Sequence, residues 1–388
     1  MYTSYASTDK NKSNSGLVMG IIFLVVASVF ALLVYCGWNK LAIAIEVIDV
    51  SADFLAGTKR LMLVPFMYYM ILMIFFLFYL ASVFSVESMA TITPDPNNDG
   101  GSFIPLKKKI DWNDKGVGKT ANIFLAFLTF GLIWVTFFLS QSNNYVTLVS
   151  ASTFYFSSNR DTWGSGKVML ALNWAWVHNI GSIAFGSLII AIMFTVRMIV
   201  YYACKQAEKS AGENPAVKIA ICLANCILKC IEEILEYINK TAYAFMAISG
   251  ESFCPAALHG LILNLNHGAE FAFANFLAAM FMLLGKIGLT ILNTVLTYFY
   301  IKKTTPPEET ASFALPLVIV FLTTYMLVSV FIGMFDEVVF GMLTCLASDL
   351  DLHGGDNKFG PKSLHELIDN INGVEGSDKD HKETNEIQ

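Results

Sequence analysis

The chain has 388 residues, of which 55% are hydrophobic and only 14% are charged, and its mean hydropathy is +0.57. These values lie outside the range of soluble globular proteins of this length, and with a formal net charge of −6 the sequence offers no basic surface for nucleic acid. Several apolar runs reach the roughly 20 residues that a membrane-spanning helix needs, and because they are continuous they exclude a transmembrane barrel. We therefore predict an all-α, polytopic helical membrane protein embedded in a lipid bilayer.

Three apolar runs in the N-terminal part are predicted membrane spans. A polar tail at residues 1–16 leads into the first, residues 17–36, which has no charge and no cleavage site after it. The second covers residues 61–86 and the third residues 121–139. Over residues 41–56, apolar and acidic residues recur at helical spacing, which predicts an amphipathic helix on the membrane surface.

The aromatic and hydroxyl-rich piece at residues 145–156 is too short to cross the membrane alone as a straight helix. It is either re-entrant or continues the preceding helix through a polar break at residues 140–144. Residues 168–202 exceed one span. Their tryptophan-containing first part is predicted to lie at the interface, and residues 180–202, with a face of small residues, to cross the membrane.

Residues 215–238 alternate lysine and glutamate with isoleucine, which predicts a second surface helix. The region around Tyr243 has polar residues in an apolar setting and is predicted to be a broken or partial segment. A long apolar helix follows at residues 269–303. The last span, residues 311–347, contains Asp336 and Glu337 well before the end of its apolar run.

The membrane domain thus covers residues 17–347 and has six spans, with one or two broken or re-entrant segments. Residues 348–388 are predicted to form a soluble tail with a short amphipathic piece at residues 363–371. No cofactor is predicted. Cys222, Cys226 and Cys230 share one helix stripe, but no histidine or fourth thiol lies near them, so this stripe indicates packing or S-acylation rather than a metal site.

Several ordered motifs resemble the choline transporter-like family of eukaryotic membrane proteins. They are IGSIAFG at residues 180–186, NKTAY at residues 239–243 followed by FCPAA, LLGKIG at residues 283–288, and CLASDLDLHGG at residues 345–355. The resemblance implies a membrane protein that transports choline or a related organic cation. Members of that family usually have about ten spans, so this chain is expected to lack the first three.

The chain departs from the family pattern at two places where the family tends to have an acid. Ala279 precedes the LLGKIG element, and Phe340 precedes the cysteine of the last helix, whereas Lys286 and Asp336 stand in matching places. An acid within a span is costly and is retained for pairing or for attracting cations, so its absence indicates that a task has been lost.

Two hypotheses of different classes follow. The first is transport of a choline-like cation, which would be recognised by aromatic faces and by more distant acids. The second is a transport-inactive member that serves as a structural or accessory subunit of a larger membrane complex, and a homodimer that rebuilds a pathway is a further alternative. The candidate substrate or pathway residues are Trp134, Asn239, Tyr243, Asn275, Lys286 and Asp336.

An enzymatic function has the least support. His178, His259 and His267 are not spaced as metal ligands, and Ser252 has no base at recognisable spacing. The sequence leaves open whether the protein belongs to the plasma membrane or to an organelle membrane, the mitochondrial membrane included.

Overall fold

The computed structural model describes residues 35, 38–88, 93–94, 106–107, 117–211, 215–304 and 314–372. In these ranges the chain is helical apart from turns, loops and one antiparallel pair of two-residue strands, β1 (Thr93–Pro94) and β2 (Leu106–Lys107), in which Thr93 pairs with Lys107 and Pro94 with Leu106. The tail at residues 1–16 and nearly all of the predicted first span at residues 17–36 lie outside the described residues.

The helices, in chain order, are α2 (Trp38–Gly57), the 3-10 helix η1 (Lys59–Leu63), α3 (Val64–Glu87), α4 (Val117–Ser157), α5 (Val168–Asn173), the π-helical turn η2 (Trp174–His178), α6 (Ile180–Ala211), α7 (Pro215–Ser249), α8 (Phe253–Asn266), α9 (Gly268–Thr304) and α10 (Ala314–Leu352). Five stretches are long and apolar enough to cross a membrane: Lys59–Val86, Thr120–Ser157, Ile180–Glu208, Gly268–Thr304 and Ala314–Leu352. They correspond to five of the six predicted spans.

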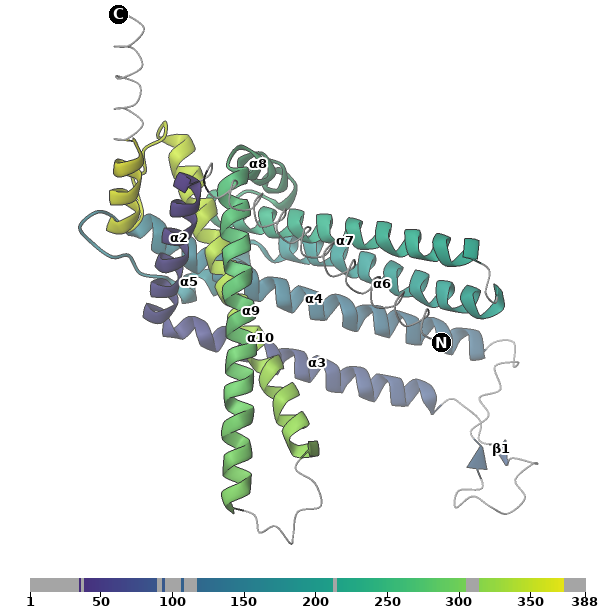
Figure 1. The fold of residues 1–388 in the computed structure, drawn as a ribbon. Helices are drawn as coiled ribbons and strands as arrows, with labels where there is room; N and C mark the ends of the chain where they lie inside the picture. The colour runs from purple at the N-terminus through teal and green to yellow at the C-terminus, as the bar shows by residue number, and fades with distance from the viewer. Residues whose placement is uncertain are drawn as a thin grey trace, which may run out of the picture.

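The helices form two groups that meet in a buried centre (Figure 1). Helices α3, α4, α6 and α7 run side by side in a row, whereas α9 and α10 cross that row and pack with α2. The core lies where the groups meet, and its largest fully buried side chains include Tyr145, Tyr155, Tyr243 and Phe340. Burial along α10 follows from this arrangement, because all its residues from Val338 to Asp349 are buried there whereas most of its first half is exposed.

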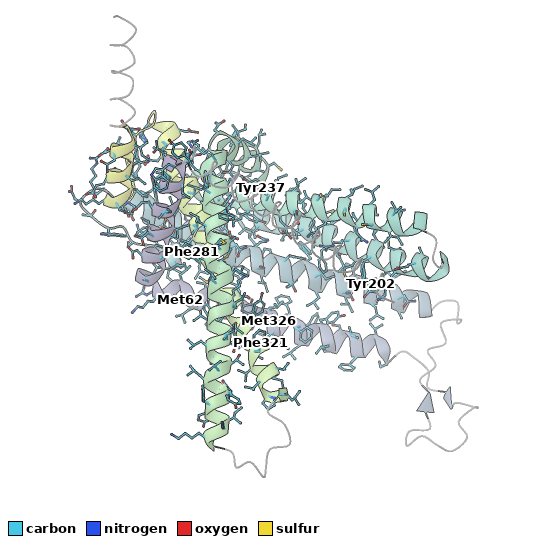
Figure 2. All side chains as sticks on the ribbon, viewed as in Figure 1. Met62, Tyr202, Tyr237, Phe281, Phe321 and Met326 are labelled. Atoms are coloured by element: carbon cyan, nitrogen blue, oxygen red, sulfur yellow. The ribbon has the colours of Figure 1, made fainter. Side chains whose placement is uncertain are left out.

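Large apolar side chains remain exposed along the outer faces of the helices (Figure 2). Phe281 on α9 is 57% exposed, Met326 on α10 is 67% exposed and Tyr202 on α6 is 62% exposed. A water-soluble monomer rarely exposes apolar surface on this scale. A bilayer would cover these faces, as the composition predicts.

Helix α4 settles the two alternatives for residues 145–156, because they continue the preceding span without a break. The polar residues at 140–144 stay helical, and hydroxyl groups within and just after this stretch donate to backbone carbonyls of the previous turn. Ser142 Oγ donates to the Phe138 carbonyl at 2.8 Å, and Thr147 Oγ1 donates to the Asn143 carbonyl at 3.0 Å. This piece is therefore not re-entrant in the structure.

Helix α7 is longer than the predicted surface helix at residues 215–238, since it runs on to Ser249. The region around Tyr243, predicted to be broken, is helical. The break comes later, at Gly250, whose φ of +72° suits glycine, and α8 begins at Phe253. Because α7 packs along α6, its isoleucine stripe is left on the outer face, where Ile219 is 69% and Ile227 is 51% exposed.

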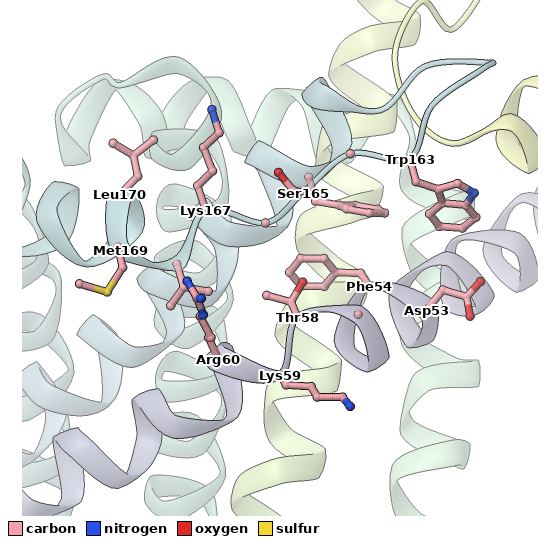
Figure 3. Close-up of a pocket in the computed structure, with 15 residues that line it drawn as sticks. Asp53, Phe54, Thr58, Lys59, Arg60, Trp163, Ser165, Lys167, Met169 and Leu170 are labelled. Carbon is pink, nitrogen blue, oxygen red and sulfur yellow. The ribbon is translucent and has the colours of Figure 1, made fainter.

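A cavity of about 700 Å³ lies where η1 meets the chain between α4 and α5 (Figure 3). Phe54 packs against Phe154 with ring centroids 5.1 Å apart, and Trp163 covers Phe154 from the loop. The cavity lining includes the basic residues Lys59, Arg60 and Lys167, of which Lys59 and Lys167 point away from each other.

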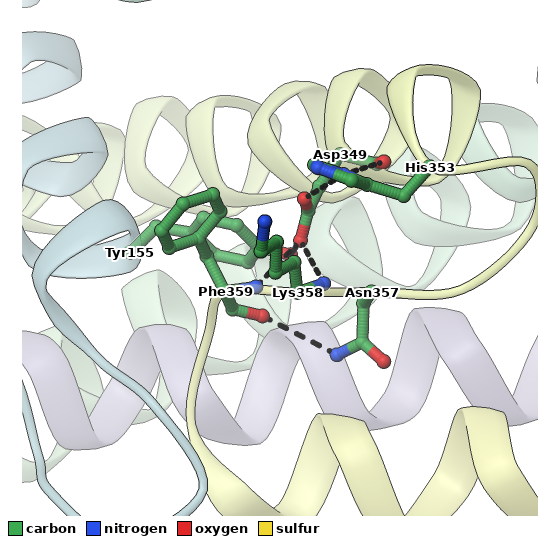
Figure 4. Close-up of polar contacts among 6 residues, drawn as sticks. All are labelled: Tyr155, Asp349, His353, Asn357, Lys358 and Phe359. Carbon is green, nitrogen blue, oxygen red and sulfur yellow. Dashed lines mark hydrogen bonds and ion pairs between the residues drawn. The ribbon is translucent and has the colours of Figure 1, made fainter.

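The C-terminal segment folds back onto the core through Asp349, and α10 continues to Leu352, past residue 347 where the last span is predicted to end. The fully buried Asp349 carboxylate accepts the backbone N–H groups of Lys358 at 3.0 Å and Phe359 at 2.9 Å, and the Tyr155 hydroxyl at 3.2 Å (Figure 4). The predicted amphipathic piece at residues 363–371 is helical, and its Leu364 and Ile368 side chains join the core.

His365 predicts a pH dependence for this docked segment. Burial, and then the charge of Arg160, lower the pKa of His365 below its ordinary value. His365 therefore binds a proton more readily in the undocked segment than in the docked one. The equilibrium constant for docking should fall as the pH falls below about 6.5, by at most about tenfold per pH unit. Hydrogen exchange of residues 357–372 at pH 7.5 and 5.5, corrected for intrinsic rates, measures this. An equal loss of protection in His365→Gln would show that another group is responsible.

Candidate functional site

A polar cleft of about 380 Å³ lies between α4, α6, α7 and α10. Its lining combines acids, amides and aromatic rings, contributed by Phe137, Gln141, Asn144, Ile190, Glu233, Glu236, Tyr237, Lys240, Tyr243, Asp336 and Glu337. The lining contains four carboxylates and one lysine, and two of the carboxylates, those of Asp336 and Glu337, lie within 4 Å of the lysine ammonium. Polar groups of this kind between otherwise apolar helices are costly in a membrane and mark candidate pathways or sites.

Lys240 connects α7 to α10 in this polar cleft. Its ammonium bonds to the Asp336 carboxylate and lies 3.9 Å from that of Glu337. It also lies 4.8 Å from the ring centroid of Phe340, which is a cation–π geometry. Glu337 in turn accepts a hydrogen bond from Asn144 Nδ2 at 3.4 Å, so α4 joins the same network.

Aromatic rings complete the surroundings of the Lys240 ammonium. The Phe340 ring centroid lies 6.4 Å from that of Tyr237 and 5.4 Å from that of Phe271, both at edge-on angles. Phe340 stands where the family resemblance led us to expect an acid, and its ring presents an aromatic face to the Lys240 ammonium.

Three predicted residues converge on the first turns of α6. Tyr243 Oη donates to the Ile183 carbonyl at 3.2 Å, Trp134 Nε1 to the Ala184 carbonyl at 3.3 Å, and Asn239 Nδ2 to the Gly186 carbonyl at 3.4 Å. Tyr243 also lines the polar cleft, whereas Asn239 and Trp134 are outside its lining. Their hydrogen bonds hold α4 and α7 against α6, next to the cleft.

Of the other three predicted residues, one lies in the polar cleft and two lie outside it. Asp336 lines the polar cleft and bonds to Lys240. Asn275 and Lys286 are half-buried on α9 and are not part of the cleft lining. The sequence prediction of a polar face on α9 and the polar cleft are therefore separate features of the structure.

The sequence analysis placed Asp336 and Glu337 inside the last apolar run, but it included neither Glu337 nor Lys240 among the candidate residues. The available signal was a lysine beside Asn239 together with two adjacent acids inside the last apolar run. Charges in apolar helices require partners, so a cation on one helix and acids on another form a natural pair. What the sequence did not supply was which lysine faced those acids.

Other chemistries have less support in the described part of the chain. No group of three or more histidine, cysteine or acidic residues there could hold a metal ion. Cys222, Cys226 and Cys230 lie on α7, and all three are exposed. The polar cleft offers a cation both carboxylate charge and aromatic faces, so binding of an organic cation is the chemistry it favours.

Comparisons with known proteins give a consistent picture. The family model described as "Plasma-membrane choline transporter" matches residues 21–351. The chain is 25% identical over 254 residues to choline transporter-like protein 1 of Caenorhabditis elegans, covering 63% of this chain and 33% of that protein. It is 27% identical over 262 residues to choline transporter-like protein 2 of Cavia porcellus, covering 64% and 36%. The matches span about a third of the length of these relatives.

Proposed function

Because the chain belongs to the plasma-membrane choline transporter family, we propose that it transports choline or a related organic cation across a membrane through the polar cleft. This family consists of transporters rather than enzymes, and the five apolar helical stretches agree with a membrane-embedded protein. The observation that supports the proposal most directly is the meeting of Asp336, Glu337 and Phe340 around one cation.

The chemistry of choline fits these groups. A quaternary ammonium has no N–H group to donate, so its recognition depends on aromatic faces at short range and on carboxylates at longer range. Tyr237 in the cleft lining and the buried Phe340 ring beneath the Lys240 ammonium supply the first, and the acids of α7 and α10 supply the second. Trp134, Asn239 and Tyr243 would keep α6 in register with α4 and α7 beside this site.

A second function, that of an accessory subunit in a larger membrane complex, is favoured by one observation. Lys240 already bonds to Asp336 and lies 3.9 Å from Glu337, so an ammonium is present beside these acids without a ligand. Extraction in a mild detergent, followed by sizing and mass spectrometry, separates the two roles. A fixed stoichiometry with other proteins supports the subunit role, and a monomer or homodimer supports transport by this chain itself.

Uptake of labelled choline into proteoliposomes tests the transport proposal. We expect uptake above that of empty liposomes, and we expect Asp336→Asn to reduce it about tenfold or more, since the cleft would lose a carboxylate next to an unchanged lysine. Asp351→Asn, an acid at the exposed end of the same helix, is the matched control and should retain uptake. Wild-type protein that is folded but gives no uptake would refute transport by this chain.

A further inference from the structure

We infer that the Lys240 side chain is a tethered cation that occupies the cation-binding position of the polar cleft, and that a substrate must displace it. This inference rests on the proposed function, and it adds a residue that determines how strongly the cleft binds cations. The starting observation is that one ammonium takes the aromatic and acidic contacts that an organic cation would need.

The position of Lys240 in α7 explains why its ammonium stays there. The preceding residue, Asn239, is 2% exposed, and Tyr243 one turn later is 1% exposed, so this part of α7 is fixed against α6. The lysine stem then extends toward α10, where only 21% of the side chain is exposed. Fixed backbone and limited space leave the ammonium few alternative positions.

The geometry indicates competition with an external cation. Asp336 bonds to Lys240, Glu337 lies 3.9 Å from the same ammonium, and the Phe340 ring lies beneath it, so a second cation cannot take these contacts while Lys240 is in place. A ligand can bind here if the lysine swings outward, toward Glu233 and Glu236 on the same helix, which also line the polar cleft. The free energy needed to move Lys240 outward would then lower the affinity of the cleft for an external cation.

Chemical rescue tests this inference without requiring transport. Lys240→Ala vacates the cation position and leaves two carboxylates without their ammonium, so we expect its apparent melting temperature to fall. Added tetramethylammonium should bind in the vacated position and raise that temperature by about 3 °C or more in a saturable manner. The wild type should show no such shift at the same concentrations, because its own lysine is in place.

The controls separate the cation position from a general salt effect. Lys205→Ala removes a charge from an exposed part of α6 and should show no response to tetramethylammonium. Lys240→Met, which retains most of the side-chain bulk, should respond less than Lys240→Ala because it leaves less space. Sodium chloride at equal ionic strength corrects for screening.

The outcomes of this experiment and of the uptake assay are distinct. Saturable rescue of Lys240→Ala together with absent uptake in the wild type would support the tethered cation and refute transport. Absence of rescue in Lys240→Ala and Lys240→Met, including the case in which both stay unfolded with tetramethylammonium present, would overturn the inference. Equal stabilisation of wild type and Lys240→Ala would also overturn it, because the bound cation would then lie elsewhere.

Discussion

Replacing Gly186 with leucine is expected to prevent the protein from assembling into a monodisperse, folded form. A Cβ atom at Gly186 would collide with the Tyr243 hydroxyl and lie 2.7 Å from Phe253 Cε2. Both rings are buried, so neither has free space to move into. Close packing makes added volume costly, typically about 1–3 kcal/mol for small additions, and a leucine adds far more than that.

The matched control is Gly181→Leu, five residues earlier on the same helix. A Cβ atom at Gly181 would meet nothing within 4 Å, so this variant should be extracted and sized like the wild type. Gly186→Ala is a milder test and should lower the apparent melting temperature. Adding Tyr243→Phe to this variant should restore part of the loss, because it removes the hydroxyl that lies nearest to the new Cβ atom. Equal behaviour of Gly186→Leu and Gly181→Leu in size-exclusion chromatography would contradict the packing seen at α6.

The two glycines also show a limit of sequence interpretation. Both belong to the small-residue face predicted for residues 180–202, and the pattern gave no means of ranking them. Their difference arises because α7 packs closely against α6 at Gly186, where Asn239 and Tyr243 donate to backbone carbonyls. A donor that binds a carbonyl on another helix leaves no signal in the residue types of that helix.

The membrane class and the position of most spans could be predicted because they depend on local composition. Helix α3, predicted at residues 61–86, is found at Val64–Glu87, since a run that is apolar on all sides has one stable form in a bilayer. The family resemblance, which depended on ordered motifs, is confirmed by the family match. Residues 140–144 were ambiguous because serine and asparagine can either end a helix or bond back within it.

Only two residues of the cleft lining, Tyr243 and Asp336, were among the candidates identified from the sequence. Asp336 was identified as a costly charge inside an apolar run, yet Lys240 is 96 residues away in sequence. Lysines are common at helix surfaces, and only the crossing of α7 and α10 selects this one. The same reason explains why Lys286, a candidate residue in the sequence, lies outside the cleft lining: its residue type and apolar surroundings do not show which helix it faces.

Replacing Asp349 with alanine is expected to release the C-terminal segment from the core. The substitution removes the acceptor of two backbone N–H groups and of the Tyr155 hydroxyl, all of them half-buried or buried. Hydrogen bonds to a charged group contribute about 1.5–3 kcal/mol each, and donors left without a partner in a buried site add to the loss. Because the three bonds share one carboxylate, their contributions are not additive, and we expect a total loss of about 3–5 kcal/mol in the free energy that holds this segment.

Trypsin sensitivity is the measurement, because Lys358 and Lys362 lie in the segment that Asp349 holds. In Asp349→Ala, cleavage at these lysines should be at least about 100-fold faster than in the wild type, since proteolysis follows the population of the open segment. Asp351→Ala is the control. Its carboxylate is 46% exposed and pairs with His267 at 2.9 Å, an exposed contact worth at most about 1 kcal/mol. If both variants were cleaved at the wild-type rate, Leu364 and Ile368 alone would hold the segment, and the buried carboxylate would have no docking role.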